Sequence, residues 1–296
     1  MTRATKGIIQ KQSDPHHISN RNEKKVRKQL VVLLALTLAL VTAWAQQPQK
    51  INYRTSTFIK IAPDQETAML DFMRVNSTKL IQAQMSAGQP IATWVLQRVV
   101  FSGVPAMEYN YIQTNDFNGA PQELNASARD QICRKAIGMS YQEYQQKLRS
   151  FGSVVGNILA RVEATAPGST VKEGSYIQVA RWKITSQRGE DYGNYIAGFQ
   201  LPLNTQAVKE GRILGWNAAR VLSPGGADAP FDASTSTIVK DLASALPATL
   251  NDPNQAAMNF IKVFPGQSFV SFVDQGRALR KQVSTVLLRV MLLVER

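Results

Sequence analysis

The sequence predicts an α+β fold in which one strand–helix–strand–strand–helix unit occurs twice. The first observation is the stretch Trp94–Gly103, WVLQRVVFSG, whose pattern W-x3-R-V-x3-G returns at Trp216–Gly225. The second is that further identical residues align in the same order when the chain is shifted by 122 or 123 positions, and later by 128. Chance rarely preserves both order and spacing, so the sequence indicates an internal duplication with two copies.

The aligned residues extend along most of the chain. The pairs are Tyr53 with Tyr176, Gly88 with Gly211, Trp94 with Trp216, Arg98 with Arg220, Gly103 with Gly225, Gly138 with Gly266, Ser140 with Ser268, Arg149 with Arg277 and Leu159 with Leu287. We expect the first copy to span residues 46–168 and the second to span 169–296. Residues 1–45 have no counterpart.

Residues 1–45 have the three parts of a secretory signal peptide. The basic stretch Lys24–Lys28 leads into the apolar run Leu30–Thr42, and Ala43-Trp-Ala45 provides a small-x-small cleavage site. An uncleaved membrane anchor is the alternative, but the apolar run of about 15 residues is shorter than the roughly 20 that span a bilayer. The sequence therefore predicts cleavage after Ala45 and a secreted or periplasmic protein.

The charge of the remaining chain is modest. The whole chain has 34 Lys and Arg, 21 Asp and Glu, and a net charge of +13. Residues 1–45 hold eight of the basic and two of the acidic residues, which leaves 26 against 19 and a net charge of +7. The remaining basic residues are scattered singly, so we expect no nucleic-acid partner. We also expect no membrane span after cleavage and no requirement for an oligomer.

Histidine and cysteine usage limits the chemistry. The two histidines, His16 and His17, both precede the predicted cleavage site, so the mature chain has no imidazole. Histidine-dependent nucleophiles, histidine-ligated haem and the usual zinc sites are therefore excluded, and we expect no cofactor and no metal. The lone thiol, Cys133, aligns with Ile261, which predicts a buried and unreactive side chain.

The first half of each unit is readily predicted. Tyr53–Ile61 alternates and is rich in Thr and Ile, which indicates a strand, and Ala62-Pro63-Asp64 begins a helix. Gly88-Gln-Pro90 ends that helix. Ile91–Phe101 and Glu108–Phe117 are then predicted as the two strands of a hairpin.

The second half of each unit is predicted as helical. A short helix is expected at Ala126–Ile137, and Ser140 with Glu143 has capping-box spacing at the start of a long helix. The long helix is expected to include the amphipathic stretch Gly156–Ala164. The apolar run Val286–Val294 aligns with that stretch, so we expect a helix packed in the core rather than a membrane segment.

Two prolines add detail to the second copy. Pro202 is expected to divide the first helix of this copy into Asp191–Gln200 and Thr205–Glu210, with a kink between them. Pro253 is expected at the first position of a later short helix.

The strand–helix–hairpin order resembles the dimeric α+β barrel superfamily, whose members include antibiotic-biosynthesis monooxygenase-like, EthD-like and NIPSNAP-like families. The resemblance rests also on Ala207–Trp216, AVKEGRILGW, and on hairpins ending at Asn115–Phe117 and Lys240–Leu242. It covers about Tyr53–Phe117 and Tyr176–Leu242, and the helical extensions are not general to the superfamily.

The resemblance implies that two ferredoxin-like units pair their sheets into a barrel. Here, both units would lie on one chain as a pseudo-dimer. Haem-binding enzymes of the superfamily typically use a histidine, and no matching position supplies one. Cofactor-free oxygenases and isomerases remain, but none of their catalytic motifs matches residue by residue, so no catalytic residue is predicted.

The candidate ligand-binding residues come from the repeated motif and the first hairpin. Strand alternation places Trp94 with Arg98, and Trp216 with Arg220, on equivalent faces. If that face lines the barrel interior, these residues and the nearby Tyr109 and Tyr111 could bind an aromatic or carboxylate-bearing molecule. Alternatively, each Trp fills core and each Arg pairs with a carboxylate such as Glu108 or Asp232. The expected counterparts of the two tyrosines are Phe231 and Ala233.

Two functions remain open at this point. The first is a secreted, non-catalytic protein that binds a small ligand or a partner through a pseudo-dimeric barrel. The second is a cofactor-independent enzyme, similar to a monooxygenase or an isomerase, that acts on a small hydrophobic or aromatic substrate. A filled barrel interior would favour the first function, and an open cavity would be compatible with the second.

Overall fold

The computed structural model describes residues 52–102, 108–185, 189–225, 229–246 and 253–296. The chain divides into a unit of Met1–Gln49 and a unit of Lys50–Arg296, of which only the second is described below. The predicted signal peptide, with His16 and His17, lies outside the described residues.

The first half of the described unit contains four strands and the helices between them. Its elements in chain order are β1 (Asn52–Ile61), the 3-10 turn η2 (Pro63–Gln65), α2 (Glu66–Phe72), the π turn η3 (Met73–Ser77), α3 (Thr78–Ser86), β2 (Ile91–Ser102), β3 (Tyr111–Asn118), α4 (Ala126–Ile137), α5 (Tyr141–Phe151) and β4 (Gly152–Thr165).

The second half repeats this order. Its elements are β5 (Tyr176–Ile184), α6 (Gly189–Tyr195), the π turn η4 (Ile196–Gln200), α7 (Leu201–Lys209), β6 (Gly215–Ser223), β7 (Ala233–Val239), α8 (Leu242–Ala245), α10 (Pro253–Val263), α11 (Phe269–Leu279) and β8 (Arg280–Glu295).

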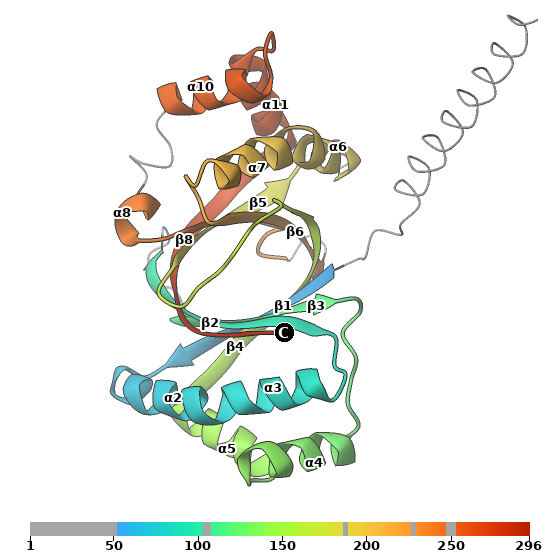
Figure 1. Cartoon of the computed structure of the whole chain (residues 1–296), viewed down its shortest axis with the longest axis vertical. Coiled ribbons are helices and arrows are strands. Elements are labelled where there is room, and N and C mark those ends of the chain that lie inside the picture. Colours follow the sequence, from blue (N-terminus) through green and yellow to red (C-terminus); the bar gives the residue numbers. More distant parts are fainter. Residues whose placement is uncertain (1–51, 103–107, 186–188, 226–228, 247–252) are drawn as a thin grey trace, which may run out of the picture. The chain divides into compact units, whose positions relative to one another are not determined.

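The eight strands form a closed antiparallel barrel in the order β1-β3-β2-β8-β5-β7-β6-β4 (Figure 1). Within each half, the last strand pairs with the first, so β4 lies beside β1 and β8 lies beside β5. The halves join where β2 pairs with β8 and where β4 pairs with β6. This arrangement confirms the predicted pseudo-dimeric α+β barrel made of two ferredoxin-like units.

The strand registers agree with the sequence alignment of the two halves. Thr55 lies opposite Leu159 in the first half, and Gln178 lies opposite Leu287 in the second. These positions are related by the shifts of 123 and 128 that the sequence shows. The two halves are therefore structurally equivalent, while their origin by duplication stays a prediction.

The prediction of helices at Gly156–Ala164 and Val286–Val294 was wrong, because both stretches belong to strands, β4 and β8. Val286, Leu288 and Val290 face the barrel interior, Leu287 packs under helices of its own half, and Leu292 packs under helices of the other half. A strand buried on both faces is apolar at nearly every position, so it lacks the alternation that identifies a half-buried strand.

The helix that contains Pro202 is continuous, which corrects the predicted division. α6, η4 and α7 follow one another without a break, and Pro202 lies in the first turn of α7, directly after the π turn. The first half has an equivalent π turn, η3, although it has Lys79 where the second half has Pro202. The π turn is thus a feature of both halves that does not require the proline.

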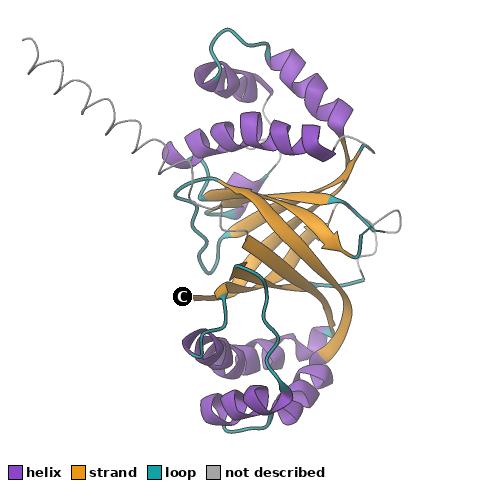
Figure 2. Cartoon of the chain, turned by 90° about the vertical axis from the view of Figure 1, so that its right-hand side faces the viewer, coloured by secondary structure: helices purple, strands orange, loops and turns teal. Residues whose placement is uncertain are grey.

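The helices cover the outer face of the barrel on two opposite sides (Figures 1 and 2). Two apolar clusters fill the space between helices and sheet, one containing Trp94 and Tyr111 and the other containing Trp216 and Tyr192. A third cluster lies inside the barrel. Within the described ranges, no helix is long and apolar enough to cross a membrane.

Candidate functional site

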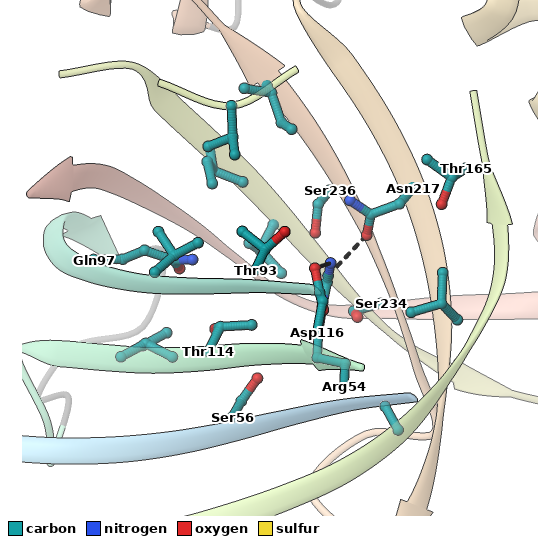
Figure 3. A pocket seen from close by; sticks show the side chains of 18 of the residues that line it. Arg54, Ser56, Thr93, Gln97, Thr114, Asp116, Thr165, Asn217, Ser234 and Ser236 are labelled. Carbon is teal, nitrogen blue, oxygen red and sulfur yellow. Dashed lines mark hydrogen bonds and ion pairs between the residues drawn. The ribbon is translucent and has the colours of Figure 1, made fainter. Parts of the chain in front are cut away.

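The barrel encloses a cavity of about 320 Å³ (Figure 3). Its apolar walls come from alternate residues of the strands, including Val95, Ile112, Ile158, Val179, Ile238 and Leu288. The exposed residues Asn118 and Glu295 are part of the lining at the end of the barrel where β1, β2, β5 and β6 begin. We refer to this end as the mouth, because the cavity reaches solvent there.

An ion pair lies near the mouth. Arg54 on β1 donates from Nε and Nη2 to the two carboxylate oxygens of Asp116 on β3, at 2.6 and 2.9 Å. Its Nη1 donates at 2.8 Å to the side-chain oxygen of Asn217 on β6 (Figure 3). The contact links the two halves across the interior, and the bidentate geometry holds the guanidinium in one orientation.

Uncharged polar side chains occupy the middle of the barrel. They are Ser56, Gln97, Thr114, Ser234 and Ser236, from four different strands (Figure 3). Gln97, Thr114 and Ser236 are buried. Groups that can both donate and accept hydrogen bonds are thus distributed along an otherwise apolar wall, which is typical of small-molecule sites.

A second arginine lies deeper in the cavity, among aromatic rings. The guanidinium carbon of Arg181 on β5 lies 4.9 Å from the ring centre of Phe231, 5.5 Å from that of Phe58 and 5.7 Å from that of Tyr109. Its Nη2 donates to the Tyr109 hydroxyl, and its Nε is buried without a hydrogen-bond partner. Burial raises the pKa of Tyr109, although the charge of Arg181 opposes this shift, so the phenol stays protonated at neutral pH.

The structure does not bring the repeated Trp and Arg residues into the cavity. Trp94 and Trp216 are 1% and 2% exposed and pack outside the barrel, under the helices. Their strand face is therefore not the interior, and the packing alternative holds for both tryptophans.

The partners of the two arginines differ from those suggested. Arg98 pairs with Glu66 at 3.1 Å, and Arg220 pairs with Glu163 at 2.8 Å and also donates to the Gly189 carbonyl. Asp232 pairs with Lys183 instead. Glu163 precedes the linker between the two halves, where a sequence alone gives no indication that it approaches β6.

The two tyrosines of the first hairpin lie on different sides of the sheet. Tyr109 packs against the interior cluster and contacts Arg181, so it is the predicted site residue that lies next to the cavity. Tyr111 is fully buried outside the barrel, and its hydroxyl has no hydrogen-bond partner. Burial, aided by the Glu66 carboxylate, raises the pKa of Tyr111 to about 12. Ligand binding at these predicted residues stays a prediction.

Sequence reasoning missed Arg54, Asp116, Asn217 and Arg181. All four lie on the strand face opposite to the one that carries the Trp and Arg motif. One available signal was the difference between the two copies, because Arg54 aligns with Ile177, Asp116 with Ile238, and Phe58 with Arg181. Charged residues that replace apolar ones in a repeated core position point to a role beyond packing.

The described residues offer few side chains that could bind a metal ion. The described residues contain no histidine, and among them no three His, Cys, Asp or Glu side chains gather as a metal site would require. Cys133 is buried beneath Leu80 and Tyr144, as predicted, and burial raises the pKa of its thiol. A buried thiol with a raised pKa forms little thiolate at neutral pH, which is typical of structural cysteines.

No family model and no curated protein matches the sequence. Solved structures do match. One is described as that of a "putative monooxygenase" from Lactobacillus acidophilus NCFM, with 8% identity, a TM-score of 0.51, and coverage of 83% of this chain and 97% of the other. Another is an anthrone oxidase-like protein, with 9% identity, a TM-score of 0.50, and coverage of 83% and 94%. At this identity the likeness shows the fold, and the chain is similar to proteins of the dimeric α+β barrel superfamily.

Proposed function

We propose that the chain binds a small aromatic or carboxylate-bearing molecule inside its barrel. The observation that carries the proposal is the cavity of about 320 Å³, which has apolar walls and a few convergent polar groups. Ligand pockets usually measure roughly 300–1,000 Å³ and have this composition, so the occupant is a small molecule of one or two rings.

Catalysis without a cofactor is the second candidate. An open cavity is the condition under which this function stays possible, and the two solved structures described as a monooxygenase and as anthrone oxidase-like support it. Tyr109, Arg181 and the Arg54–Asp116 pair are the groups that could contact a substrate there. Arg181 would stabilise negative charge that develops on the substrate, and the Tyr109 hydroxyl would supply a proton.

Mass spectrometry of molecules retained by the purified protein tests ligand binding. The wild type is expected to release a small aromatic or acidic compound on denaturation. Ser56→Phe, which fills the cavity, should release less of it. The matched control is Val75→Phe, because Val75 is 53% exposed on the helical layer, away from the barrel. Equal amounts from all three proteins would argue against the cavity as the binding site.

The retained compound also separates the two functions. If the purified protein converts it in air without added cofactor, with consumption of oxygen or with isomerisation, the second candidate is correct. Binding without conversion favours the first.

We also propose that the protein is exported and cleaved after Ala45, as the basic, apolar and small-x-small parts of residues 1–45 indicate. N-terminal sequencing of the exported protein is expected to begin at Gln46. A cytoplasmic chain with an intact N-terminus would contradict export, and His16 and His17 would then be part of the functional protein.

A further inference from the structure

Among the described residues, the guanidinium of Arg181 has no neutralising carboxylate. The other arginine of the cavity, Arg54, is neutralised by Asp116 through two hydrogen bonds. In the described part of the chain no carboxylate pairs with Arg181, whose hydrogen-bond partner is the neutral Tyr109 hydroxyl. The surrounding rings compensate part of the lost hydration through cation–π contacts, but they leave Nε without an acceptor.

The fold itself does not require a cation at this position. In the first half, the equivalent residue is Phe58, which lies opposite Ile112 and Gly156, and Arg181 correspondingly lies opposite Ser234 and Ser284. The equivalent position in the first half is therefore occupied by an apolar ring. Arg181 is partly buried and its Nε has no acceptor among the described residues, which costs free energy that the first half avoids, so its presence in the second half supports a role in binding.

We propose that Arg181 binds the carboxylate of a flat aromatic acid that enters the barrel with its charged group first. This deepens the proposed function and rests on it. A carboxylate supplies the acceptor that Nε lacks and matches the planar guanidinium. Phe58 and Phe231 flank the guanidinium and offer their rings to an aromatic body. The apolar side chains Val95, Ile112 and Leu288 line the rest of the path.

Paired probes test the charge requirement directly. Calorimetric titration would compare 2-naphthoate with 2-naphthamide, which has nearly the same shape and no charge. The wild type is expected to bind the carboxylate at least about tenfold more tightly than the amide, because a charge-assisted pair with a partly buried guanidinium is worth more than a neutral hydrogen bond.

The variant Arg181→Phe places the residue of the first half in the second half. It should lose the preference for the carboxylate, with at least a tenfold weaker affinity, while its midpoint of urea unfolding stays the same or rises. Arg181→Lys keeps a positive charge and should keep part of the preference. Arg134→Gln removes an arginine whose side chain is 62% exposed outside the barrel, and it should bind both probes as the wild type does.

The outcomes distinguish this inference from the proposed function. Equal affinity of the wild type for both probes, or an unchanged preference in Arg181→Phe, would overturn the role of Arg181 while leaving small-molecule binding in the barrel intact. If neither probe binds the wild type, the inference is also overturned, and the measurement of retained molecules decides separately whether the barrel binds a ligand at all.

Discussion

At the residue scale, the two halves differ in the charged residues that they place in the interior of the barrel. On the helix-facing side, Trp94 and Trp216 are buried in equivalent places, although Tyr111 corresponds to Ala233. On the interior side, Arg54 and Asp116 of the first half correspond to Ile177 and Ile238 of the second. Each pair lies on equivalent, neighbouring strands, so the same pair of positions is occupied by an ion pair in one half and by two isoleucines in the other.

This correspondence suggests a substitution that the protein itself has already accommodated. Arg54→Ile alone leaves the Asp116 carboxylate unpaired. The two side chains are 18% and 30% exposed, so we expect a loss of roughly 1–3 kcal/mol in the free energy of unfolding, between the losses for exposed and for buried ion pairs. The double variant Arg54→Ile/Asp116→Ile should recover to within about 1 kcal/mol of the wild type. Urea denaturation measures both.

The control for this prediction is a pair on the outer face. Arg98 is 49% exposed in its ion pair with Glu66, so Arg98→Ile should cost less than about 1 kcal/mol. A double variant at Arg54 and Asp116 that is no more stable than the single one would show that the ion pair is required for the fold.

Part of the site could be predicted from the sequence at this scale. The alignment correctly matched Tyr109 with Phe231, and these residues form two walls around Arg181. Arg181 itself could not be found by searching for repeated residues, because its importance lies in the difference from Phe58. The sequence predicted which alternate residues of a strand share a face. It could not predict which face points into the barrel, because that depends on where the helices pack and both faces carry large side chains.

At the element scale, local signals were reliable where they involve capping and turns. The capping box at Ser140 and Glu143 forms as predicted, with the Ser140 hydroxyl accepting from the Glu143 amide and the Glu143 carboxylate accepting from the Ser140 amide. α4 begins and ends where expected. The end of α5 was missed, because the chain turns from helix into strand at Phe151–Gly152 without a proline or a polar loop to mark the change.

Gly152 marks this change in three dimensions. A Cβ at this position would lie 2.1 Å from the Lys60 carbonyl oxygen and 2.8 Å from Cδ1 of Ile61, both on β1. Gly152→Ala is therefore expected to push β4 away from β1 and to lower the free energy of unfolding by about 1–3 kcal/mol, as overpacking does.

Gly156, four residues later on the same strand, provides the comparison. Its Cβ would meet Phe58 at 3.6 Å, an ordinary contact, so Gly156→Ala should change stability by less than about 1 kcal/mol. Similar unfolding midpoints for the two variants in urea would contradict the close approach of β4 to β1 at Gly152.

At the scale of the whole molecule, closure of the barrel depends on both halves. The first half alone would leave β2 and β4 as unpaired edges, and the second half alone would leave β6 and β8 unpaired, because these strands make the two junctions. Exposed edges and an exposed interior wall favour association over a stable monomer. Since the edges of the halves are equivalent, each half also has the geometry to pair with a copy of itself.

The interior charges decide which pairing is preferred, and this can be tested with residues 46–168 and 169–296 expressed separately and together. Two copies of the second half would place an Arg181 where Phe58 now stands, close to the other Arg181, and would supply neither Arg54 nor Asp116. Two guanidinium groups at that distance, both only partly exposed to solvent, repel each other. Two copies of the first half would contain only neutralised pairs of the Arg54–Asp116 type.

We therefore expect light scattering after size exclusion to show a homodimer of the first half, aggregation of the second half alone, and a one-to-one heterodimer when both are expressed together. Arg181→Phe should rescue the second half as a homodimer, and a second half that is a folded monomer on its own would contradict the dependence of the barrel on both halves.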